Sequence, residues 1–406
     1  MERVAVEPGA RNRCLLVLGA GPAQLGLLEA ARAHGIWTAV CDRDPAAPGF
    51  AFADRRCIVS TDDESAIERL ASALPLGGLI APGKDPPVAV AARVAEKLGL
   101  AHPLSPLTAQ LATSKLRQRE ALAEAAVPQP RWQIASGEDS MLDVPLPVVV
   151  KAADRSGRSG LALVRRVSQL APAIAAARAE SRTGAVLVEE YVDGPEVTVT
   201  GFSAAGEFVP LAVIDRLSGK GGSVGVPLAY TWPSAYAEAA AEVTRRAVEA
   251  LGIQEGPTQT QLRLSRGGPE VIEVAARLGG GHDAALVELV TGIDLNGLAL
   301  AAALGRPVAA SEIKAAFRET VGGAATRFLI APPGLLESVE VPQGLKGVVS
   351  TRLYREPGHT FGPFRRPSDR AGAVLAAGAS AAEALARVDA AVERIRFVTA
   401  DAEAMV

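Results

Sequence analysis

GPTQTQLRLSRGGPEVIEVAARLGGGHD, residues 256–283, is the stretch that decides the fold, because its pattern is that of a β-hairpin. Polar and apolar residues alternate on both sides of SRGGP, which we expect to form a five-residue turn. Pairing Leu264 with Glu270 across this turn places Gln261 opposite Glu273. Because residues two apart on a strand share a face, the pairing assigns every side chain of the hairpin to one of two faces.

One face of this hairpin is polar and the other is apolar. The polar face carries one carboxylate, one guanidinium and two amide groups, and the glycine run 279–281 follows it. Oxygen ligands suit hard cations such as magnesium, and an arginine beside them can hold a phosphate. An ordinary half-solvated polar face is the alternative interpretation. The polar face comprises Gln259, Gln261, Glu273, Ala275 and Arg277, and the apolar face Leu262, Leu264, Ile272 and Val274.

The composition predicts a chain with a sizeable core and two or three domains, since 49% of its 406 residues are hydrophobic. A net charge of −3 gives no electrostatic reason to expect nucleic acid or an anionic membrane as a partner. Cys14, Cys41 and Cys57 are widely spaced, which favours a reducing cytoplasm over a disulfide framework or a zinc site. The apolar run 14–18 is too short for a signal peptide or a membrane span.

The N-terminal region begins with a strand, a glycine turn and a helix in CLLVLGAGPAQLGLLEAARAHG, followed by the strand IWTAVCDRD. Strands and helices continue to alternate to about residue 105, which predicts a doubly wound α/β domain. Gly19, Gly21 and Gly26 allow a tight turn, and Asp42 ends the second strand where a ribose-binding acid would lie in a dinucleotide site. Glycines that serve packing alone are the alternative.

The next informative stretch, PVVVKAADRSGRSGLALVRR, is a strand with Lys151, a loop of small residues and another strand. Small residues let backbone N–H groups approach phosphate oxygens, and a lysine supplies positive charge. The lysine precedes the glycines and no helix follows, so this is not a Walker loop. A plain hairpin turn is the alternative.

A strand, a short connector and a second strand follow in AVLVEEYVDGPEVTVTGFS. Such a connector can present backbone groups to an adenine edge, with Glu196 placed for ribose hydroxyls, although a solvated glutamate is the simpler interpretation. The glycine-rich loop 216–231, which contains Lys220, is long enough for a lid. After Asp283 come two helices, and residues 311–406 mix strands with a final amphipathic helix.

The order of these parts resembles that of the ATP-grasp superfamily of carboxylate–amine ligases, over about residues 14–306 and more loosely beyond. GxxxTQ followed by EVAARLGGGH resembles bacterial L-amino-acid and peptide ligases in particular. The resemblance implies a mixed α/β and α+β fold. Its parts are a Rossmann-like domain (residues 1–107), a two-lobed ATP-grasp domain (112–306, with a flexible subdomain at about 125–190) and a C-terminal lobe (307–406).

The resemblance also implies roles for individual residues in nucleotide binding. The segment 189–192 resembles the hinge that contacts adenine, Glu196 resembles the ribose ligand, and the loop 156–160 resembles the mobile phosphate cover. The residues assigned to the nucleotide in this way are Lys115, Lys151, Ser156, Gly157, Ser159, Gly160, Glu189, Glu190, Val192 and Glu196.

On the hairpin, Glu273 resembles the glutamate that bridges two metal ions, and Gln261 stands where the family has its earlier acidic ligand. Arg277 resembles the arginine that steadies the transferred phosphate, with Lys151 as a second catalytic cation. Ala275 replaces the family's asparagine and cannot coordinate. This chain therefore holds its metals with fewer charges, or uses a nearby acid such as Asp283, or is weakly active.

The implied reaction starts with ATP phosphorylating a carboxylate to an acyl phosphate. An amine then attacks, and an amide, ADP and phosphate result. The implied cofactors are ATP and magnesium, two ions by the family pattern, with manganese able to use the same ligands. Small-molecule carboxylates and amines are the expected partners, and a homodimer stays open. The rivals are a carboxylase of the biotin-carboxylase type, a dehydrogenase and a catalytically weak nucleotide-binding module.

Overall fold

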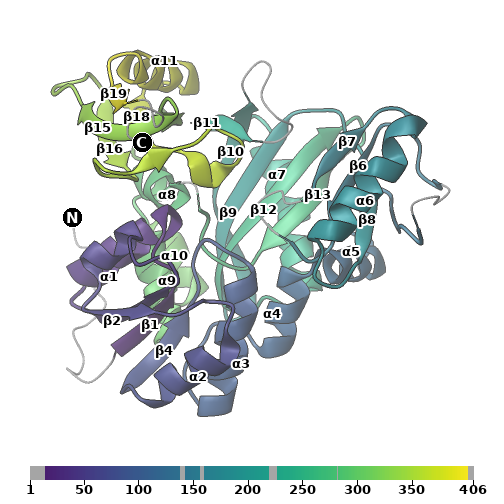
Figure 1. Ribbon diagram of the computed structural model, residues 1–406, viewed down its shortest axis with the longest axis horizontal. Coiled ribbons are helices and arrows are strands. Elements are labelled where there is room, and N and C mark those ends of the chain that lie inside the picture. Colours follow the sequence, from purple (N-terminus) through teal and green to yellow (C-terminus); the bar gives the residue numbers. More distant parts are fainter. Residues whose placement is uncertain (1–13, 138–141, 156–159, 219–225, 281, 401–406) are drawn as a thin grey trace.

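The computed structural model describes residues 14–137, 142–155, 160–218, 226–280 and 282–400 (Figure 1). Four sheets account for the strands that pair in this part of the chain. No single helix within these ranges is long and apolar enough to cross a membrane; α8 (Asp283–Thr291) and α9 (Leu295–Ala303) reach that length only as a pair bent by 115°.

The N-terminal sheet is parallel, with the order β3-β2-β1-β4, and helices pack on both of its faces, as the sequence predicted. Leu15 and Val17 of β1 join a core with helix α1, whereas Leu16 and Leu18 join a second core with α2 and α3. The elements are β1 (Cys14–Leu18), α1 (Leu25–Ala33), β2 (Trp37–Asp42), β3 (Arg55–Ile58), α2 (Glu64–Ser72), β4 (Leu76–Ile80) and α3 (Pro86–Leu98), with short 3-10 turns at Pro22–Gln24 and Pro48–Phe52.

The glycine turn after β1 is filled by the protein's own groups. Asp42 accepts a hydrogen bond from the Ala20 N–H at 2.9 Å, and the Gly49 N–H donates to the Ala20 carbonyl at 2.6 Å. A Cβ at Gly19 would lie 2.9 Å from the Gln24 side chain. Close packing against Gln24 therefore requires a glycine at position 19, and the Asp42 carboxylate already accepts a backbone hydrogen bond.

A small antiparallel sheet follows, with the order β5-β8-β6-β7. It carries the predicted strand with Lys151, and the helix with Lys115 leads into it. Ser114 caps this helix by accepting a hydrogen bond from the Arg117 N–H, so Lys115 is its first residue. The elements are α4 (Pro106–Thr113), α5 (Lys115–Glu124), β5 (Trp132–Ile134), β6 (Val148–Ala152), β7 (Ala162–Val164), α6 (Leu170–Glu180) and β8 (Val186–Glu190).

The large sheet has eight antiparallel strands in the order β13-β12-β9-β10-β11-β14-β18-β16. Its last three strands come from the terminal segment, so the sheet continues past residue 307, where the resemblance placed a domain boundary. The strands are β9 (Glu196–Ala204), β10 (Glu207–Ser218), β11 (Pro227–Trp232), β12 (Gly256–Ser265), β13 (Gly268–Ala275), β14 (Gly323–Leu329), β16 (Val348–Leu353) and β18 (Gly372–Gly378).

Helices and one further sheet complete the chain. Helix α7 packs its apolar face on β9, β12 and β13, and the third sheet, with the order β17-β15-β19, lies beside α11 in the terminal lobe (Figure 1). These elements are α7 (Ala237–Ala250), α10 (Ala310–Ala316), β15 (Gly334–Glu340), β17 (Thr360–Phe361), α11 (Ala381–Val392) and β19 (Arg396–Ala400), with short 3-10 turns at Val167–Gln169 and Pro367–Asp369.

The hairpin β12–β13 has the predicted pairing at its polar face but a different turn. Gln261 pairs with Glu273 as expected, yet Ser265 pairs with Gly268, so the turn holds two residues and the five-residue turn was wrong. A β-bulge next to Gln261 absorbs the difference, because Leu262 pairs with Val271 and leaves Ile272 unpaired. Val271 is buried in the core, where the sequence placed Ile272.

All three cysteines are free and buried. Burial raises the pKa of the Cys14 thiol to about 12, so it stays protonated at neutral pH. Cys41 and Cys57 are neighbours on paired strands, and burial raises the pKa of both thiols. These thiols carry no sign of a disulfide or of a reactive nucleophile.

Candidate active site

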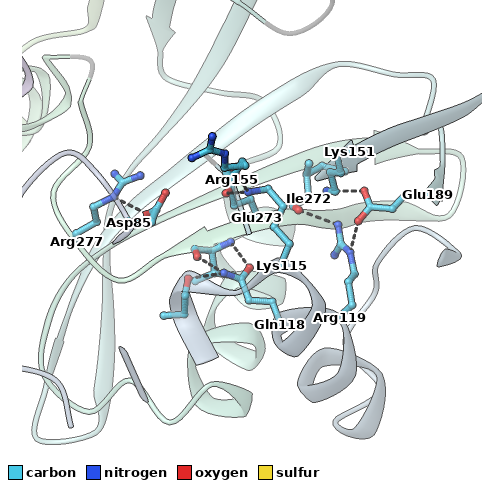
Figure 2. A network of polar contacts seen from close by, with 12 residues as sticks. Asp85, Lys115, Gln118, Arg119, Lys151, Arg155, Glu189, Ile272, Glu273 and Arg277 are labelled. Carbon is cyan, nitrogen blue, oxygen red and sulfur yellow. Dashed lines mark hydrogen bonds and ion pairs between the residues drawn. The ribbon is translucent and has the colours of Figure 1, made fainter. Parts of the chain in front are cut away.

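A buried ion-pair triad joins the small sheet to helix α5. Glu189, at the end of β8, binds the Lys151 ammonium at 2.7 Å through Oε2 and the Arg119 Nε at 2.6 Å through Oε1 (Figure 2). The Glu189 side chain is only 3% exposed. Burial works against the carboxylate, but the charges of Arg119 and Lys151 outweigh it and lower the pKa of Glu189 to about 2.

Lys151 has a lowered pKa within the same triad. Burial disfavours its charged form and lowers the pKa to about 8, even though the Glu189 carboxylate favours that form. The positive charges of Arg119 and Lys115 also lower the pKa of Lys151. Lys151 is therefore mostly charged at neutral pH, and an anion arriving beside it would restore its affinity for the proton.

Arg119 also connects the triad to the large sheet, and sequence reasoning assigned it no role. Its Nη1 donates to the Val271 carbonyl and its Nη2 to the Ile272 carbonyl, each at 2.8 Å, at the bulge of β13. Gln118 pairs with both backbone groups of Val274, donating at 2.8 Å and accepting at 3.0 Å. A signal existed, because Arg119 lies four residues after Lys115 and so shares its helix face.

Lys115 brings its ammonium to the metal-ligand candidate on the hairpin. Its Nζ lies 3.3 Å from Oε1 of Glu273 and also donates to the Arg155 carbonyl. Burial alone would raise the pKa of Glu273, but Lys115, Lys151 and Arg277 together lower it. One ionised carboxylate therefore lies among three cations, which is an arrangement that suits a polyphosphate with a divalent ion.

The donors around Glu273 test whether the hairpin could hold magnesium. Gln261 lies directly opposite on β12, and Gln259 lies opposite Ala275, which has no donor. No group of three or more His, Cys, Asp or Glu side chains able to hold a metal occurs in the described ranges. One carboxylate and amide oxygen fit an ion that is shared with phosphates and water. They do not form a cage for a second ion.

Asp283, the acid named as a compensating ligand, lies at another place on this face. A Cβ at Gly279 would come 2.0 Å from Asp283 Oδ2 and 2.5 Å from Gln259 Nε2, so these two side chains converge at Gly279. Asp283 is buried and begins helix α8. Its service as a metal ligand stays a prediction.

Arg277 is held by the carboxylate of Asp85, a residue of the N-terminal domain to which sequence reasoning assigned no role. Its Nε lies 2.7 Å from Oδ1 of Asp85, just before α3, and its Nη1 donates to the Leu278 carbonyl at 3.0 Å (Figure 2). The Gly83 N–H donates to the same carbonyl at 3.2 Å. Asp85 comes after a strand of the parallel sheet, at the carboxyl ends of the strands, where α/β folds bind ligands. This position could have marked Asp85 as a candidate site residue.

Glu196 is also in the site but is already paired. Its carboxylate lies 2.6 Å from Nε of Arg216 and 3.5 Å from Nη2 of Arg263. Arg263 donates to the Val192 carbonyl at 2.9 Å and lies over the Tyr191 ring. A ribose reaching Glu196 would share its oxygens with these guanidinium groups.

The remaining predicted residues divide into three groups. Glu190 points to the surface, where its carboxylate pairs with Arg131 at 2.8 Å, away from Glu189. Gly160 packs against helix α6 with φ +67°, and a Cβ there would lie 3.0 Å from Ala177. Ser156, Gly157 and Ser159 lie outside the described residues, as do Lys220 and Gly281.

Comparison with known proteins matches two regions of the chain to protein families. Residues 144–284 match the ATP-grasp domain, and residues 327–400 match the L-amino acid ligase C-terminal domain 2. The uncharacterized protein y4rH of Sinorhizobium fredii is 27% identical over 398 residues, covering 91% of this chain and 79% of y4rH. Dapdiamide A synthase of Enterobacter agglomerans is 27% identical over 190 residues, which is 43% of this chain and 44% of that enzyme.

Solved structures share the fold over nearly the whole chain. An L-amino acid ligase from Bacillus licheniformis aligns with a TM-score of 0.81 at 23% identity, covering 97% of this chain and 100% of that one. At this identity the likeness concerns the fold.

Proposed function

We propose that this chain, which belongs to the ATP-grasp superfamily and has the ATP-grasp fold, is an ATP-dependent ligase that joins a carboxylate to an amine. One observation carries the proposal. Lys115, Lys151 and Arg277 act together on the Glu273 carboxylate from three different elements, at the junction of the small and large sheets. With Arg119 as a fourth cation and with Glu189 and Asp85 as their paired carboxylates, the site keeps one positive charge in excess for a nucleotide triphosphate.

In the proposed reaction, a carboxylate oxygen of the first substrate attacks the γ-phosphorus of ATP and ADP leaves. The amine nitrogen of the second substrate then attacks the acyl carbon, phosphate leaves, and the nitrogen loses a proton. Lys115 and Lys151 bind the transferring phosphoryl group, and Arg277 stabilises the acyl phosphate. Catalysis then rests on position and electrostatics, with no side-chain nucleophile.

Arg277 is well placed for this role because its guanidinium is held from one side. Nε and Nη1 bind Asp85 and the Leu278 carbonyl, and Nη2 has no hydrogen bond to any described residue. A fixed guanidinium with one nitrogen left over can receive a phosphate oxygen without reorganising.

For the nucleotide, we place adenine at the hinge 189–192 and the ribose at Glu196, with Gly160 and the neighbouring Ser156, Gly157 and Ser159 covering the phosphates. Glu273 and Gln261 would hold magnesium, which neutralises charge between the β- and γ-phosphates when bound. The family pattern implies two ions. With one carboxylate on this face, we assign the second ion to the phosphates and water alone.

The substrates we propose are an amino acid or another small carboxylic acid and an amino acid amine. Support comes from the matched L-amino acid ligase C-terminal domain 2 and from the likeness to dapdiamide A synthase. We place the enzyme in the cytoplasm, since its three cysteines are free. A homodimer stays a proposal.

A second candidate function is a nucleotide-binding module with little turnover. Gln261 and Ala275 favour it, because both replace groups that would hold metal in the usual family pattern. The two candidates differ in one respect that is simple to measure, since both bind ATP but only the ligase consumes it.

The test is a phosphate-release screen over pairs of amino acids and small carboxylic acids, with mass spectrometry of the products. We expect phosphate release that needs both an acid and an amine, together with an amide product. Phosphate release driven by bicarbonate alone would instead revive the carboxylase. ATP binding without turnover over the whole panel would favour the module, and no ATP binding would contradict both.

A further inference from the structure

Arg370, just before β18, is a buried cation that differs from the other guanidinium groups near the site. Arg119, Arg216 and Arg277 each pair with a carboxylate at 2.6–2.7 Å. Arg370 is 4% exposed and forms no ion pair with any residue that the structure describes. Burying a charge without a partner costs several kcal/mol, so an unpaired guanidinium at this depth needs an explanation.

The contacts of Arg370 leave much of its guanidinium unused. Its Nη2 donates to the Pro227 carbonyl of β11 at 2.6 Å, and its Cζ lies 3.4 Å from the centre of the Phe328 ring. Nε is enclosed and has no acceptor, and Nη1 makes no hydrogen bond within the described ranges. An aromatic ring and one carbonyl satisfy only part of a group with five N–H donors.

Two phenol groups lie near this cation. Tyr230, on β11, contacts the same Phe328 ring as Arg370, and Tyr354, after β16, donates its backbone N–H at 2.8 Å to the carbonyl of Ala371, the residue next to Arg370. The charge of Arg370 favours the ionised forms of both phenols. Tyr230 contacts Phe328 edge to face, with ring centres 5.0 Å apart. In the described part of the chain neither hydroxyl has a hydrogen-bond partner. The cluster thus combines a cation with two O–H donors over an aromatic floor.

This cluster adjoins the proposed reaction site. Arg216 forms an ion pair with Glu196, with Nε 2.6 Å from the carboxylate, and its guanidinium lies over the Tyr230 ring at 5.5 Å, so one side chain belongs to both groups. The charge of Asp283, at the start of α8, favours the cationic forms of both Arg277 and Arg370. Arg370 itself belongs to the terminal lobe, so the cluster joins the proposed site to that lobe.

We propose that Arg370, with Tyr230 and Tyr354, forms a subsite for a carboxylate carried by the amine substrate. The carboxylate supplies the missing counter-charge, and the phenol hydroxyls donate to its remaining lone pairs. The amine nitrogen then faces the acyl phosphate held at Arg277, and the Asp283 charge complements the ammonium form. The inference rests on the proposed function and adds to it the residues that hold the acceptor's carboxylate, which stays free in the product.

The test measures binding and needs no turnover, so it remains informative if the chain proves to be a poor ligase. Thermal unfolding is followed with magnesium and ADP while each L-amino acid of a panel is compared with its α-carboxamide at equal ionic strength. We expect amino acids of the panel to raise the midpoint of the wild type and their amides to leave it unchanged. Loss of a charge-assisted contact weakens binding roughly 10- to 100-fold, so Arg370→Met should abolish the shift.

Arg327→Met is the matched control, because Arg327 lies on β14 and pairs with Asp389 at 3.4 Å, away from the cluster. It should keep the amino-acid shift. Arg370→Lys retains the charge and should lose less binding than Arg370→Met; together with Tyr354→Phe it carries the test if the methionine variant does not fold. Equal shifts by amino acids and amides, a wild-type shift in Arg370→Met, wild-type shifts in both Arg370→Lys and Tyr354→Phe, or no shift with any amino acid would overturn the proposal.

Discussion

Raising the pH should weaken nucleotide binding through Lys151, and the size of the effect follows from the buried triad. Burial places the pKa of Lys151 at about 8 in the free protein. One pH unit above its pKa a lysine is only about one-tenth protonated, so the dissociation constant of an ATP analogue should rise roughly tenfold from about pH 7 to about pH 9. The groups that face this ammonium are Glu189 on β8, Arg119 and Lys115 on α5, and Glu273 on β13.

The assay is calorimetric titration with a non-hydrolysable ATP analogue and saturating magnesium at several pH values. Lys151→Arg keeps its charge throughout this range and should bind with a nearly constant dissociation constant. Lys151→Met should bind roughly 10- to 100-fold more weakly than the wild type at pH 7 and also show little dependence on pH. A wild-type dissociation constant that stays flat from pH 7 to 9, or a rise of equal size in the methionine variant, would mean that the protonated Lys151 does not bind the nucleotide.

The same pKa has a consequence for folding. Because Lys151 binds its proton less tightly in the folded chain than in the unfolded chain, its burial is most costly below about pH 8. The cost is relieved as the pH rises towards 10.5. The difference corresponds to roughly 3 kcal/mol. Glu189 has the opposite effect: its contribution is present above pH 4.5 and is lost as the pH falls towards 2.

Three further changes test the site. Asp85→Asn should lower turnover roughly 10- to 100-fold with an unchanged ATP dissociation constant, because Arg277 loses its carboxylate partner. The control Glu29→Gln breaks another ion pair of the N-terminal region, the one with Arg352, and should turn over normally. Wild-type turnover in Asp85→Asn would mean that Asp85 does not position Arg277. Arg119→Met should lower the free energy of unfolding, measured in urea, by about 3–5 kcal/mol, since Glu189 keeps only one of its two cations. The control Arg131→Met removes the exposed pair with Glu190 and should leave the unfolding midpoint near the wild-type value. Equal losses of stability in the two variants would contradict the buried triad. Gln261→Glu should lower the magnesium concentration for half-maximal turnover several-fold, and Glu273→Gln should abolish turnover without unfolding the chain. Near-normal activity of Glu273→Gln would mean that the hairpin is not the metal site.

The sequence allowed the hairpin face to be predicted because side chains on a strand alternate with a period of two. That rule needs no knowledge of the rest of the fold, and it paired Gln261 with Glu273 as the structure does. It could not anticipate the bulge, because two compensating changes, a shorter turn and one unpaired residue, leave the pairing at Gln261 unaltered. Only the side chains beyond the bulge, Val271 and Ile272, exchange their environments.

Residues whose partners are distant in the chain were the ones missed. Arg119 meets Glu189 across 70 residues, and Asp85 meets Arg277 across 192. Neither pair belongs to a local pattern, so its formation depends on how the small sheet and the N-terminal sheet dock on β13. The Glu190 side chain turns away from Glu189 for a local reason, since neighbouring residues on a strand point to opposite faces and Glu189 takes the inner one. Its part in the hinge stays a prediction.

The central claim, transfer of the γ-phosphoryl group of ATP to a substrate carboxylate, is tested most directly by oxygen tracing. The acid substrate found in the screen is labelled with oxygen-18 in its carboxylate, and the released phosphate is examined by mass spectrometry. Because the attacking oxygen stays on phosphorus when the amine displaces the phosphate, we expect one labelled oxygen in each phosphate and one in the amide. Unlabelled phosphate from a reaction that forms the amide would contradict the acyl phosphate and the role given to Arg277.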